Sequence, residues 1–468
     1  MRKIDKGQLR ILTLNDVYQF PARQDKQGER KAELRVSHDA FWLRLCLMGD
    51  LGFSEAYMYS EVECDDLVTL FLVFLDNRDN LVDLDSRISY LYKLPQKLTS
   101  YRFLNTISNS RSNISAHYDI SNAMFAGFLS KDMTYSCGIF ADLDGDLKKD
   151  CSGEDSKRLV QSSPSTSSKS SSGSSTPAKI QGDDEEVDEL YEAQIRKLDH
   201  IIKKVCIWPG NRVLEIGSGW GSMAIRIAQT VPGTTIDTIT LSSQQLTLAE
   251  ERIAAAGLSD RIRVHLMDYR DMPAEWEHAF DRLVSVEMIE AVGREFIPAY
   301  FAKLDWALKL QNACGVIQSI TIPEARFERY IREVDFIRKW VSIFPGGFLP
   351  TLTFLLSSLT AGSAGRLTVD SVSNIGPHYA RTLREWRRRF LEQFEGVIEP
   401  ALMEEHPEVM GSSAKEARKE VEVFKRKWIC EFDYYCYCEV GFTTRTLGDH
   451  IVSFTREGFQ DYGCDTYV

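Results

Sequence analysis

The chain has 468 residues, of which 43% are hydrophobic, and it carries a net charge of −12 at pH 7. This length corresponds to about three domains, and the apolar fraction suffices for a sizeable core. The acidic balance argues against nucleic acid as a main partner, because duplex binding relies on clustered Lys and Arg. An anionic membrane would have to be met by a local basic patch and not by the overall field.

The sequence indicates neither a targeting segment nor a metal site. Residues 1–14 contain no apolar run long enough for a signal peptide. The longest apolar stretch, 67–75, is shorter than the ~20 residues of a membrane span. The ten cysteines are scattered and form no CxxC pair. We therefore expect no metal, and buried free thiols in a reducing compartment such as the cytoplasm.

Residues 1–100 are predicted to form an α+β unit. Residues 8–20 have the pattern of a hairpin. Residues 40–48 and 65–76 have the pattern of helices, the second of them capped by Asp65 or Asp66. We see no catalytic constellation in this unit.

Two segments of unusual composition follow. Residues 112–140 are rich in aromatic, Asn and Ser residues, whereas residues 146–186 are acidic and Ser-rich. The second segment lacks the apolar residues needed to offset ordering entropy, so we expect a disordered insert. An amphipathic helix at 189–205 then leads into the next motif.

The central motif is VLEIGSGWG at 213–221, in which an apolar run ends in an acidic residue and three alternate glycines. Glycines let the backbone turn sharply and approach a ligand closely beside a helix N-terminus. The spacing is GxGxG and not the GxGxxG of dinucleotide sites. Glu215 at the strand end could meet a cationic ligand, so S-adenosylmethionine (SAM), with its ammonium and sulfonium groups, fits better than a pyrophosphate. A tight turn without a ligand is the alternative.

Strands and helices alternate from residue 211 to residue 318, which predicts a mainly parallel sheet. Ligands in such sheets lie beyond the carboxyl ends of the strands. The candidate residues are therefore those at the strand ends: Glu215, Thr240, Asp268, Glu287, Glu290 and Gln318.

The remaining chain departs from this alternation. Residues 323–359 include FPGGFLP and an apolar run, and we interpret them as an insertion that covers the site. The tail is predicted to be helical from residue 382. It then becomes strand-like in the aromatic segment 433–442.

Ten motifs follow one another in the order found in a known family. They are HYDIS at 117–121, TYSC at 134–137, EAQIRKLD at 192–199, VLEIGSGWG at 213–221, TLSSQQ at 240–245, DYRD at 268–271, SVEMIEAVG at 285–293, FPGGFLP at 344–350, NIGPHYARTLREW at 374–386 and YCEVGFTTRTLGD at 437–449. With these motifs the chain resembles the cyclopropane-fatty-acyl-phospholipid synthases and the mycolic acid cyclopropane synthases. The resemblance runs from about residue 40 to the C-terminus, except over 146–186.

The resemblance implies an α/β fold with a doubly wound, Rossmann-like SAM-dependent methyltransferase domain at 187–468, including a lid insertion at 323–380. It also implies a smaller lipid-binding-like domain at 1–100, with residues 101–145 connecting the two and closing over SAM. The residues that match SAM contacts of the family are Tyr135, Ser136, Glu215, Gly217, Gly219, Thr240, Gln245, Asp268, Tyr269 and Arg270. For Thr240 and Gln245, helix capping is the alternative.

The resemblance also implies a mechanism. In this family an alkene in a lipid chain attacks the sulfonium methyl group, and the resulting carbocation loses a proton to bound bicarbonate. The site must hold the alkene in line with the methyl group and exclude water. Glu290 would bind the bicarbonate hydroxyl, and Tyr379 and the Cys137 region would complete the cradle. Gln318 stands where better-known members have a histidine; glutamine can donate a hydrogen bond to an anion but cannot titrate.

Structural roles are the alternatives for several of these residues. Glu290 could be a buried capping carboxylate, and Cys137 a core thiol. His378 is expected to pack or to lie at the surface. Glu287 is a second carboxylate three residues before Glu290, and the sequence assigns it no role.

The expected function is addition of a methylene group across a cis double bond in a phospholipid acyl chain, with SAM and bicarbonate as cofactors. The alternatives are an enzyme giving a methyl- or methylene-branched lipid, an amine N-methyltransferase, and a non-catalytic lipid-binding protein. We expect a cytoplasmic protein with peripheral membrane contact through a basic face. That face would consist of Arg384, Arg387, Arg388 and Arg389. A homodimer is left open.

Overall fold

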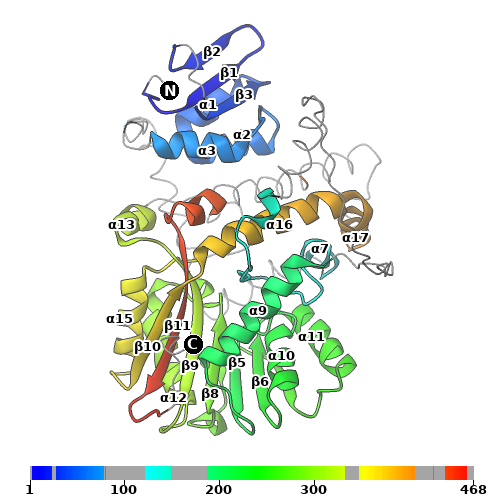
Figure 1. Ribbon diagram of the computed structural model, residues 1–468, viewed down its shortest axis with the longest axis vertical. Helices are drawn as coiled ribbons and strands as arrows, with labels where there is room; N and C mark the ends of the chain where they lie inside the picture. The colour runs from blue at the N-terminus through cyan, green and yellow to red at the C-terminus, as the bar shows by residue number, and fades with distance from the viewer. Residues whose placement is uncertain are drawn as a thin grey trace, which may run out of the picture.

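A computed structural model describes residues 3–23, 28–77, 80, 122–148, 187–332, 347–405, 425 and 438–460. Figure 1 shows a small N-terminal unit and a larger α/β domain. The HYDIS motif and most of the expected insert lie outside the described residues. Residues 145–148 are helical, so the start of the insert at residue 146 was predicted too early.

The N-terminal unit is a four-stranded sheet with three helices packed against it. The strand order is β2-β1-β3-β4, with β1 at Gln8–Leu12, β2 at Val17–Phe20, β3 at Lys31–Val36 and β4 at Val62–Cys64. The helices are α1 (Ala40–Met48), α2 (Asp50–Met58) and α3 (Leu67–Asp76). The antiparallel pairing of β1 with β2 confirms the hairpin. Asp66 caps α3 by accepting a hydrogen bond from the Thr69 N–H at 3.0 Å.

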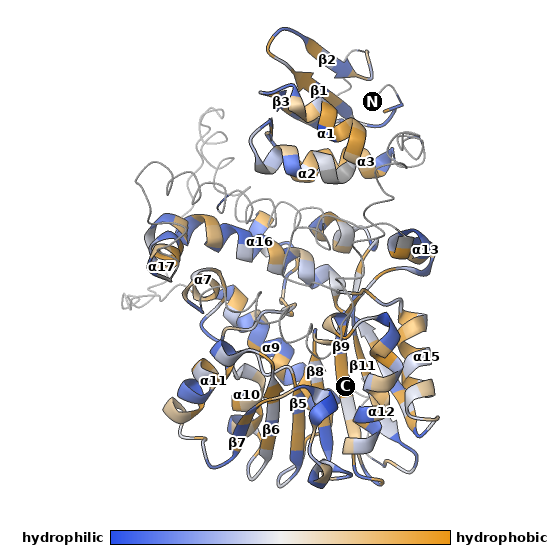
Figure 2. Ribbon diagram, turned by 180° about the vertical axis from the view of Figure 1, so that it is seen from behind, coloured by the Kyte–Doolittle hydropathy of each residue, from blue (hydrophilic) through white to orange (hydrophobic). Residues whose placement is uncertain are grey.

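The larger domain is built on a seven-stranded sheet of order β10-β11-β9-β8-β5-β6-β7. Its strands are β5 (Arg212–Ile216), β6 (Thr235–Thr240), β7 (Ile262–Leu266), β8 (Arg282–Val286), β9 (Cys314–Thr321), β10 (Leu367–Asn374) and β11 (Gly448–Arg456). Strands β5 to β9 pair in parallel, whereas β11 runs antiparallel to both of its neighbours. The predicted mainly parallel sheet is thus confirmed. Figure 2 shows apolar residues along the central strands, as expected for a sheet covered on both faces.

Two separate apolar clusters bury the two faces of this sheet. Val213 and Val284 belong to one cluster, and their chain neighbours Leu214 and Leu283 belong to the other. This alternation follows from the period of two in a strand. The first face is covered by α7 (Asn122–Phe128), α9 (Glu189–Lys204), α10 (Ser222–Thr230), α11 (Ser243–Ala255) and α16 (Gly376–Gln393). The second is covered by α12 (Ile297–Ala307), α13 (Glu324–Arg332) and α15 (Leu352–Gly362).

Shorter elements complete the domain. Helix α16 lies across one end of the sheet (Figure 1) and continues through the π-helical turn η7 (Phe394–Ile398) into α17 (Glu399–Glu405). Short 3₁₀ turns follow β7 and β8: η3 (Tyr269–Asp271), η4 (Ala274–Trp276), η5 (Ile289–Ala291) and η6 (Arg294–Phe296). No helix within the described ranges is long and apolar enough to cross a bilayer.

Two predictions about the C-terminal half are wrong. The lid was placed at 323–380, but α15 packs against α12, and β10 is an edge strand of the sheet. These elements belong to the core fold, because their apolar residues fill the second cluster. The aromatic segment was read as a strand, yet residues 438–443 are helical and the strand begins at Gly448.

Candidate active site

The strand order places the candidate site beside β5. This strand pairs with β6 on one side and with β8 on the other. The order in which the chain adds strands to the sheet therefore reverses at β5. Ligands of doubly wound sheets bind at this switch point, beyond the carboxyl ends of the strands. Glu215 lies near that end of β5, and Glu287 directly follows β8. The two carboxylates that flank the switch point are therefore the natural start for building the site.

The glycine turn after β5 has a backbone that only glycine adopts readily. Gly217 has φ +99° and Gly219 has φ +48°. A Cβ at Gly219 would meet no protein atom within 4 Å, so the space above it is open. A Cβ at Gly217 would lie 3.3 Å from the Met288 Cβ. The turn thus abuts the segment after β8, and it leaves room for a ligand at Gly219.

Glu215 is a buried carboxylate with an oxygen to spare. Its side chain is 4% exposed, and its Oε2 accepts no hydrogen bond from any described residue. Burial raises its pKa to about 8, because the charged form is desolvated. Such a group gains from a cationic partner. The ammonium group of SAM is one such partner, so the residues present fit SAM at this turn.

Polar residues after β6 and β7 line the same edge of the sheet. The Thr240 hydroxyl donates to Gln245 Oε1 at 2.8 Å. Ser242 is the residue that caps α11, so helix capping is not the role of Gln245. Asp268 accepts from Arg270 Nε at 2.8 Å and from Nη2 at 2.6 Å. Its carboxylate is thus committed to Arg270, next to the buried ring of Tyr269.

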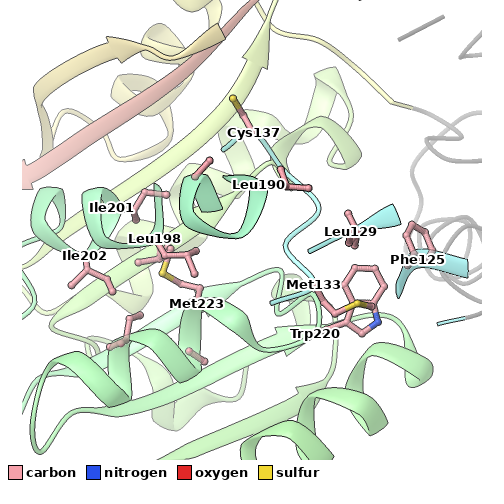
Figure 3. Close-up of a cluster of buried hydrophobic side chains, with 14 of the residues drawn as sticks. Phe125, Leu129, Met133, Cys137, Leu190, Leu198, Ile201, Ile202, Trp220 and Met223 are labelled. Atoms are coloured by element: carbon pink, nitrogen blue, oxygen red, sulfur yellow. The ribbon is translucent and has the colours of Figure 1, made fainter. Parts of the chain in front are cut away.

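The TYSC motif lies against α9 and the glycine turn. Figure 3 shows Phe125, Leu129, Met133 and Cys137 of this segment near Leu190 of α9 and Trp220 of the turn. The Tyr135 ring packs against Phe125 and Trp386, with centroids 5.4 and 5.0 Å apart. The Ser136 hydroxyl accepts a hydrogen bond from the buried Lys197 Nζ at 2.6 Å. The segment before the insert is therefore fixed beside the turn by packing and by a buried cation.

The structure brings three predicted catalytic residues together around Glu287. Glu287 Oε1 accepts from the Cys137 backbone N–H at 2.9 Å and from Gln318 Nε2 at 2.7 Å. Its Oε2 accepts from the Tyr379 hydroxyl at 2.7 Å. Three donors from separate segments thus converge on one carboxylate.

Glu290, which was expected at the centre of this cradle, makes other contacts. Its Oε1 accepts from the Ser319 hydroxyl at 3.0 Å and from the Ile320 N–H at 2.6 Å. Its Oε2 accepts nothing from the described residues. Burial, and next the charge of Glu287, raise its pKa to about 8. Burial therefore favours the protonated, neutral form of Glu290.

A third carboxylate, Asp449, completes the cluster. Its Oδ2 accepts from Gln318 Nε2 at 2.8 Å, so Gln318 bridges Asp449 and Glu287. Burial and the neighbouring carboxylates Glu287 and Glu290 raise the pKa of Asp449 well above its usual range. Sequence reasoning named Glu287 as a strand-end candidate but gave it no role, and it missed Asp449, although each stands inside a quoted motif. Both were recognisable as acids at a strand end: Glu287 follows β8 and Asp449 is the second residue of β11.

The other predictions for this region have mixed outcomes. Burial raises the pKa of the Cys137 thiol far above its usual range, so the backbone amide and not a thiolate serves the cluster. His378 Nδ1 accepts from the Phe140 N–H at 3.1 Å and is a packing residue, as expected. Three arginines of the expected basic face are ion-paired: Arg384 with Asp146 and Glu439, Arg388 with Glu385 and Glu392, and Arg389 with Asp188. Membrane contact through this face stays a prediction.

A doubly wound sheet, a glycine turn at its switch point and a spare buried carboxylate on that turn define the class of SAM-dependent methyltransferases. The profile of the mycolic acid cyclopropane synthetase family matches residues 106–155 and 181–422. The chain belongs to this family. The gap in the match falls within the Ser-rich stretch, which is therefore an insertion relative to the family.

Individual relatives agree with this assignment. The tuberculostearic acid methyltransferase of Mycobacterium tuberculosis is 34% identical over 420 residues, covering 90% of this chain and 82% of that protein. The cyclopropane-fatty-acyl-phospholipid synthase of Escherichia coli is 29% identical over 374 residues, 80% of each chain.

Solved structures show the same fold. The mycolic acid cyclopropane synthase CmaA1, solved with SAH and CTAB, aligns with a TM-score of 0.52 at 24% identity, covering 74% of this chain and 97% of that one. Coclaurine N-methyltransferase aligns with a TM-score of 0.58 at 16% identity, covering 86% and 98%.

Proposed function

We propose that this enzyme transfers the methyl group of SAM to a carbon of a cis double bond in the acyl chain of an unsaturated phospholipid. The family supports a lipid substrate, since the relatives named above are a tuberculostearic acid methyltransferase and a cyclopropane-fatty-acyl-phospholipid synthase. SAM supplies an electrophilic methyl group when it is bound. The protein must then position an alkene and remove a proton.

The observation that carries this proposal is the buried carboxylate cluster beside the glycine turn. Methylation of an alkene leaves a cation that must lose a proton, so the site needs a base in a place that excludes water. Glu287, Glu290 and Asp449 are all buried or nearly so, and Met288 connects them to the turn. An amine reacts through its own lone pair and needs no base for a carbon-bound proton, but carboxylates also bind ammonium groups, so amines are the competing substrate class.

The proposed SAM contacts follow the geometry. Glu215 would accept the ammonium group, and the open space at Gly219 would admit the ligand against the backbone. Thr240, Gln245 and the 268–270 segment would line the nucleoside. Tyr135 and Ser136 would close the site from the segment before the insert. Their fixed positions would orient SAM before the lipid arrives.

Bicarbonate fits this site less well than SAM does. The donors that the resemblance assigns to it, from Cys137, Gln318 and Tyr379, already bind the Glu287 carboxylate. Glu290 faces Ser319 and Ile320 instead. Removal of the proton is therefore left to the carboxylates of the chain itself.

Two products deserve separate assays. A cyclopropane results if the proton leaves the transferred methyl group as the ring closes. A methyl branch, after a methylene intermediate and reduction, is favoured by the match to a tuberculostearic acid methyltransferase over 90% of this chain. Proton NMR of the lipid product separates ring protons from vinylidene protons.

The test of the function is transfer of radiolabel from methyl-labelled SAM. We expect label in vesicles of an unsaturated phospholipid and none in the saturated analogue of the same headgroup. Small amines provide the third arm, because an N-methyltransferase shares this fold. Label in the amines, or equal label in both lipids, would refute the proposal. Sedimentation of the same vesicles would report the peripheral membrane contact that an acyl substrate requires.

A further inference from the structure

We propose that Glu287 is the catalytic base of this enzyme and occupies the position that a bound bicarbonate would otherwise take. This inference rests on the proposed function, because only an alkene substrate needs a base for a carbon-bound proton. It assigns the proton transfer to a residue of the chain itself. It also predicts that the enzyme works without dissolved carbonate.

The position of Glu287 in the fold suits a base. Glu287 directly follows β8 at the switch point of the sheet. The next residue, Met288, stands so close to Gly217 that a Cβ there would lie 3.3 Å from the Met288 Cβ. Burial raises the pKa of both Glu215 and Glu287, and the charge of the buried Lys197 ammonium opposes that rise at both carboxylates. Glu287 is therefore next to the place where the sulfonium of SAM is expected.

The set of donors around Glu287 also suits a base. The Cys137 amide, the Gln318 amide and the Tyr379 hydroxyl are all neutral and all point to Glu287. A carboxylate that accepts several hydrogen bonds is stabilised in its ionised form. Glu290 accepts from one hydroxyl and one amide, and Asp449 accepts from the amide that it shares with Glu287. Burial raises the pKa of Glu287 as well, but the hydrogen bonds from Cys137 and Tyr379 oppose that rise. Of the three carboxylates, Glu287 accepts the largest set of hydrogen bonds from the described residues.

The backbone conformation of Glu287 also suits a base. Glu287 has φ +47°, in the left-handed region that costs a non-glycine residue of the order of 1 kcal/mol. Its N–H still donates to the Gln318 carbonyl at 2.9 Å, so the conformation is held by the sheet. Strain of this kind is kept where a side chain must be aimed. Here the backbone conformation directs the Glu287 carboxylate toward its three hydrogen-bond donors.

The step balances without another reactant. The alkene π pair forms a bond to the SAM methyl carbon, and the carbon–sulfur pair leaves on sulfur as S-adenosylhomocysteine. Glu287 then removes a proton from the transferred methyl group, and the freed carbon–hydrogen pair closes the ring onto the cationic carbon. If a hydride first shifts from the methylated carbon to the cationic carbon, the same pair forms a double bond instead. Protonated Glu287 returns the proton to water before the next turnover. Hydrogen bonds to both carboxylate oxygens limit its own alkylation by SAM.

The structure suggests a direct test by substitution and rescue. Glu287→Gly removes the carboxylate and suits the positive φ. It leaves the Cys137 N–H and the Tyr379 hydroxyl without this acceptor, whereas Gln318 still donates to Asp449. Glu287→Gln keeps the shape but cannot take a proton. Both variants should bind SAM in calorimetry within about threefold of the wild type. Both should transfer methyl to unsaturated phospholipid more slowly by ~10²-fold or more, the scale of losing a general base.

Bicarbonate distinguishes a base from a structural residue. Added bicarbonate should accelerate Glu287→Gly at least tenfold, since it has the size and charge of the missing carboxylate. It should not accelerate Glu287→Gln, where the position is filled, or the wild type after removal of dissolved CO2. A wild type that stops without CO2, a SAM-binding Glu287→Gly enzyme that bicarbonate does not accelerate, or an active Glu287→Gln enzyme would overturn the inference. If the wild type methylates no unsaturated lipid, the proposed function fails instead.

Discussion

The glycine turn and the carboxylate cluster meet at one switch point but are built in opposite ways. The turn is nine consecutive residues, 213–221, and its geometry follows from glycine at fixed spacing. The cluster takes Cys137, Glu287, Gln318, Tyr379 and Asp449 from five segments that span more than half of the chain. Its partners are set by the order of the strands. Binding of SAM is thus encoded locally, whereas the proposed proton transfer depends on the whole fold.

The largest effect is expected at the glycine turn. Gly219→Val should abolish SAM binding in calorimetry, because a β-branched residue disfavours φ +48° and its side chain would fill the open space above the turn. Gly257→Val is the matched control, since Gly257 has φ +67° and open space but lies after α11, away from the site. It should lose similar stability and keep its SAM affinity. Unchanged SAM affinity in folded Gly219→Val would remove the turn from the site.

Glu215→Gln should weaken SAM binding by about 10- to 100-fold, the scale of one charge-assisted hydrogen bond. The affinity of the wild type for SAM should also depend on pH. Because the free protein holds this group protonated up to about pH 8, SAM affinity should rise from pH 6.5 to 8 and then level.

Folding raises the pKa of Glu215 from its usual value of 4.5 to about 8. The ligand-free protein should therefore lose stability as the pH increases through this range. Both slopes should flatten in Glu215→Gln. Calorimetry and thermal unfolding across this range measure them. A variant with the slopes of the wild type would assign the titration to another group.

Glu290→Gln tests whether the two glutamates of the cluster have different roles. Burial favours the neutral form of Glu290, so replacing it with an amide should change less than the same substitution at the proposed base Glu287. We expect turnover to fall by about tenfold and SAM affinity to stay constant. A loss as large as that of Glu287→Gln, measured in the same phospholipid assay, would return the base to Glu290.

The smallest effect is expected on the arginine helix. Arg384 binds Asp146 through two nitrogens and Glu439 through a third, so Arg384→Gln should cost about 1–3 kcal/mol of stability. Arg388 is half exposed, and Arg388→Gln should cost less than about 1 kcal/mol. Neither should alter sedimentation with anionic vesicles, because carboxylates already neutralise both side chains. Reduced vesicle binding in either variant would support the basic face as a membrane contact.

Sequence patterns predicted what depends on neighbours in the chain. The hairpin, the helices at 40–48 and 189–205 and the parallel strands follow from periodicity and caps. The edge strand β10 was missed because its alternation at 367–374 lies within the span assigned to a lid. Glu287 gained no role because its donors come from residues 137, 318 and 379, and no local spacing brings them together. Arg384 was read as a free cation for the same reason, since Asp146 lies 238 positions away.

The most direct test of the central claim is a deuterium count with SAM carrying a trideuterated methyl group. If an alkene is methylated and a base then removes a proton from the new methyl group, the lipid product keeps two deuterium atoms. Mass spectrometry of the released acyl chains reads this number. Two deuterium atoms in the product of the wild type is the predicted result. Three in the initial product, or none in the acyl chain at all, would contradict it.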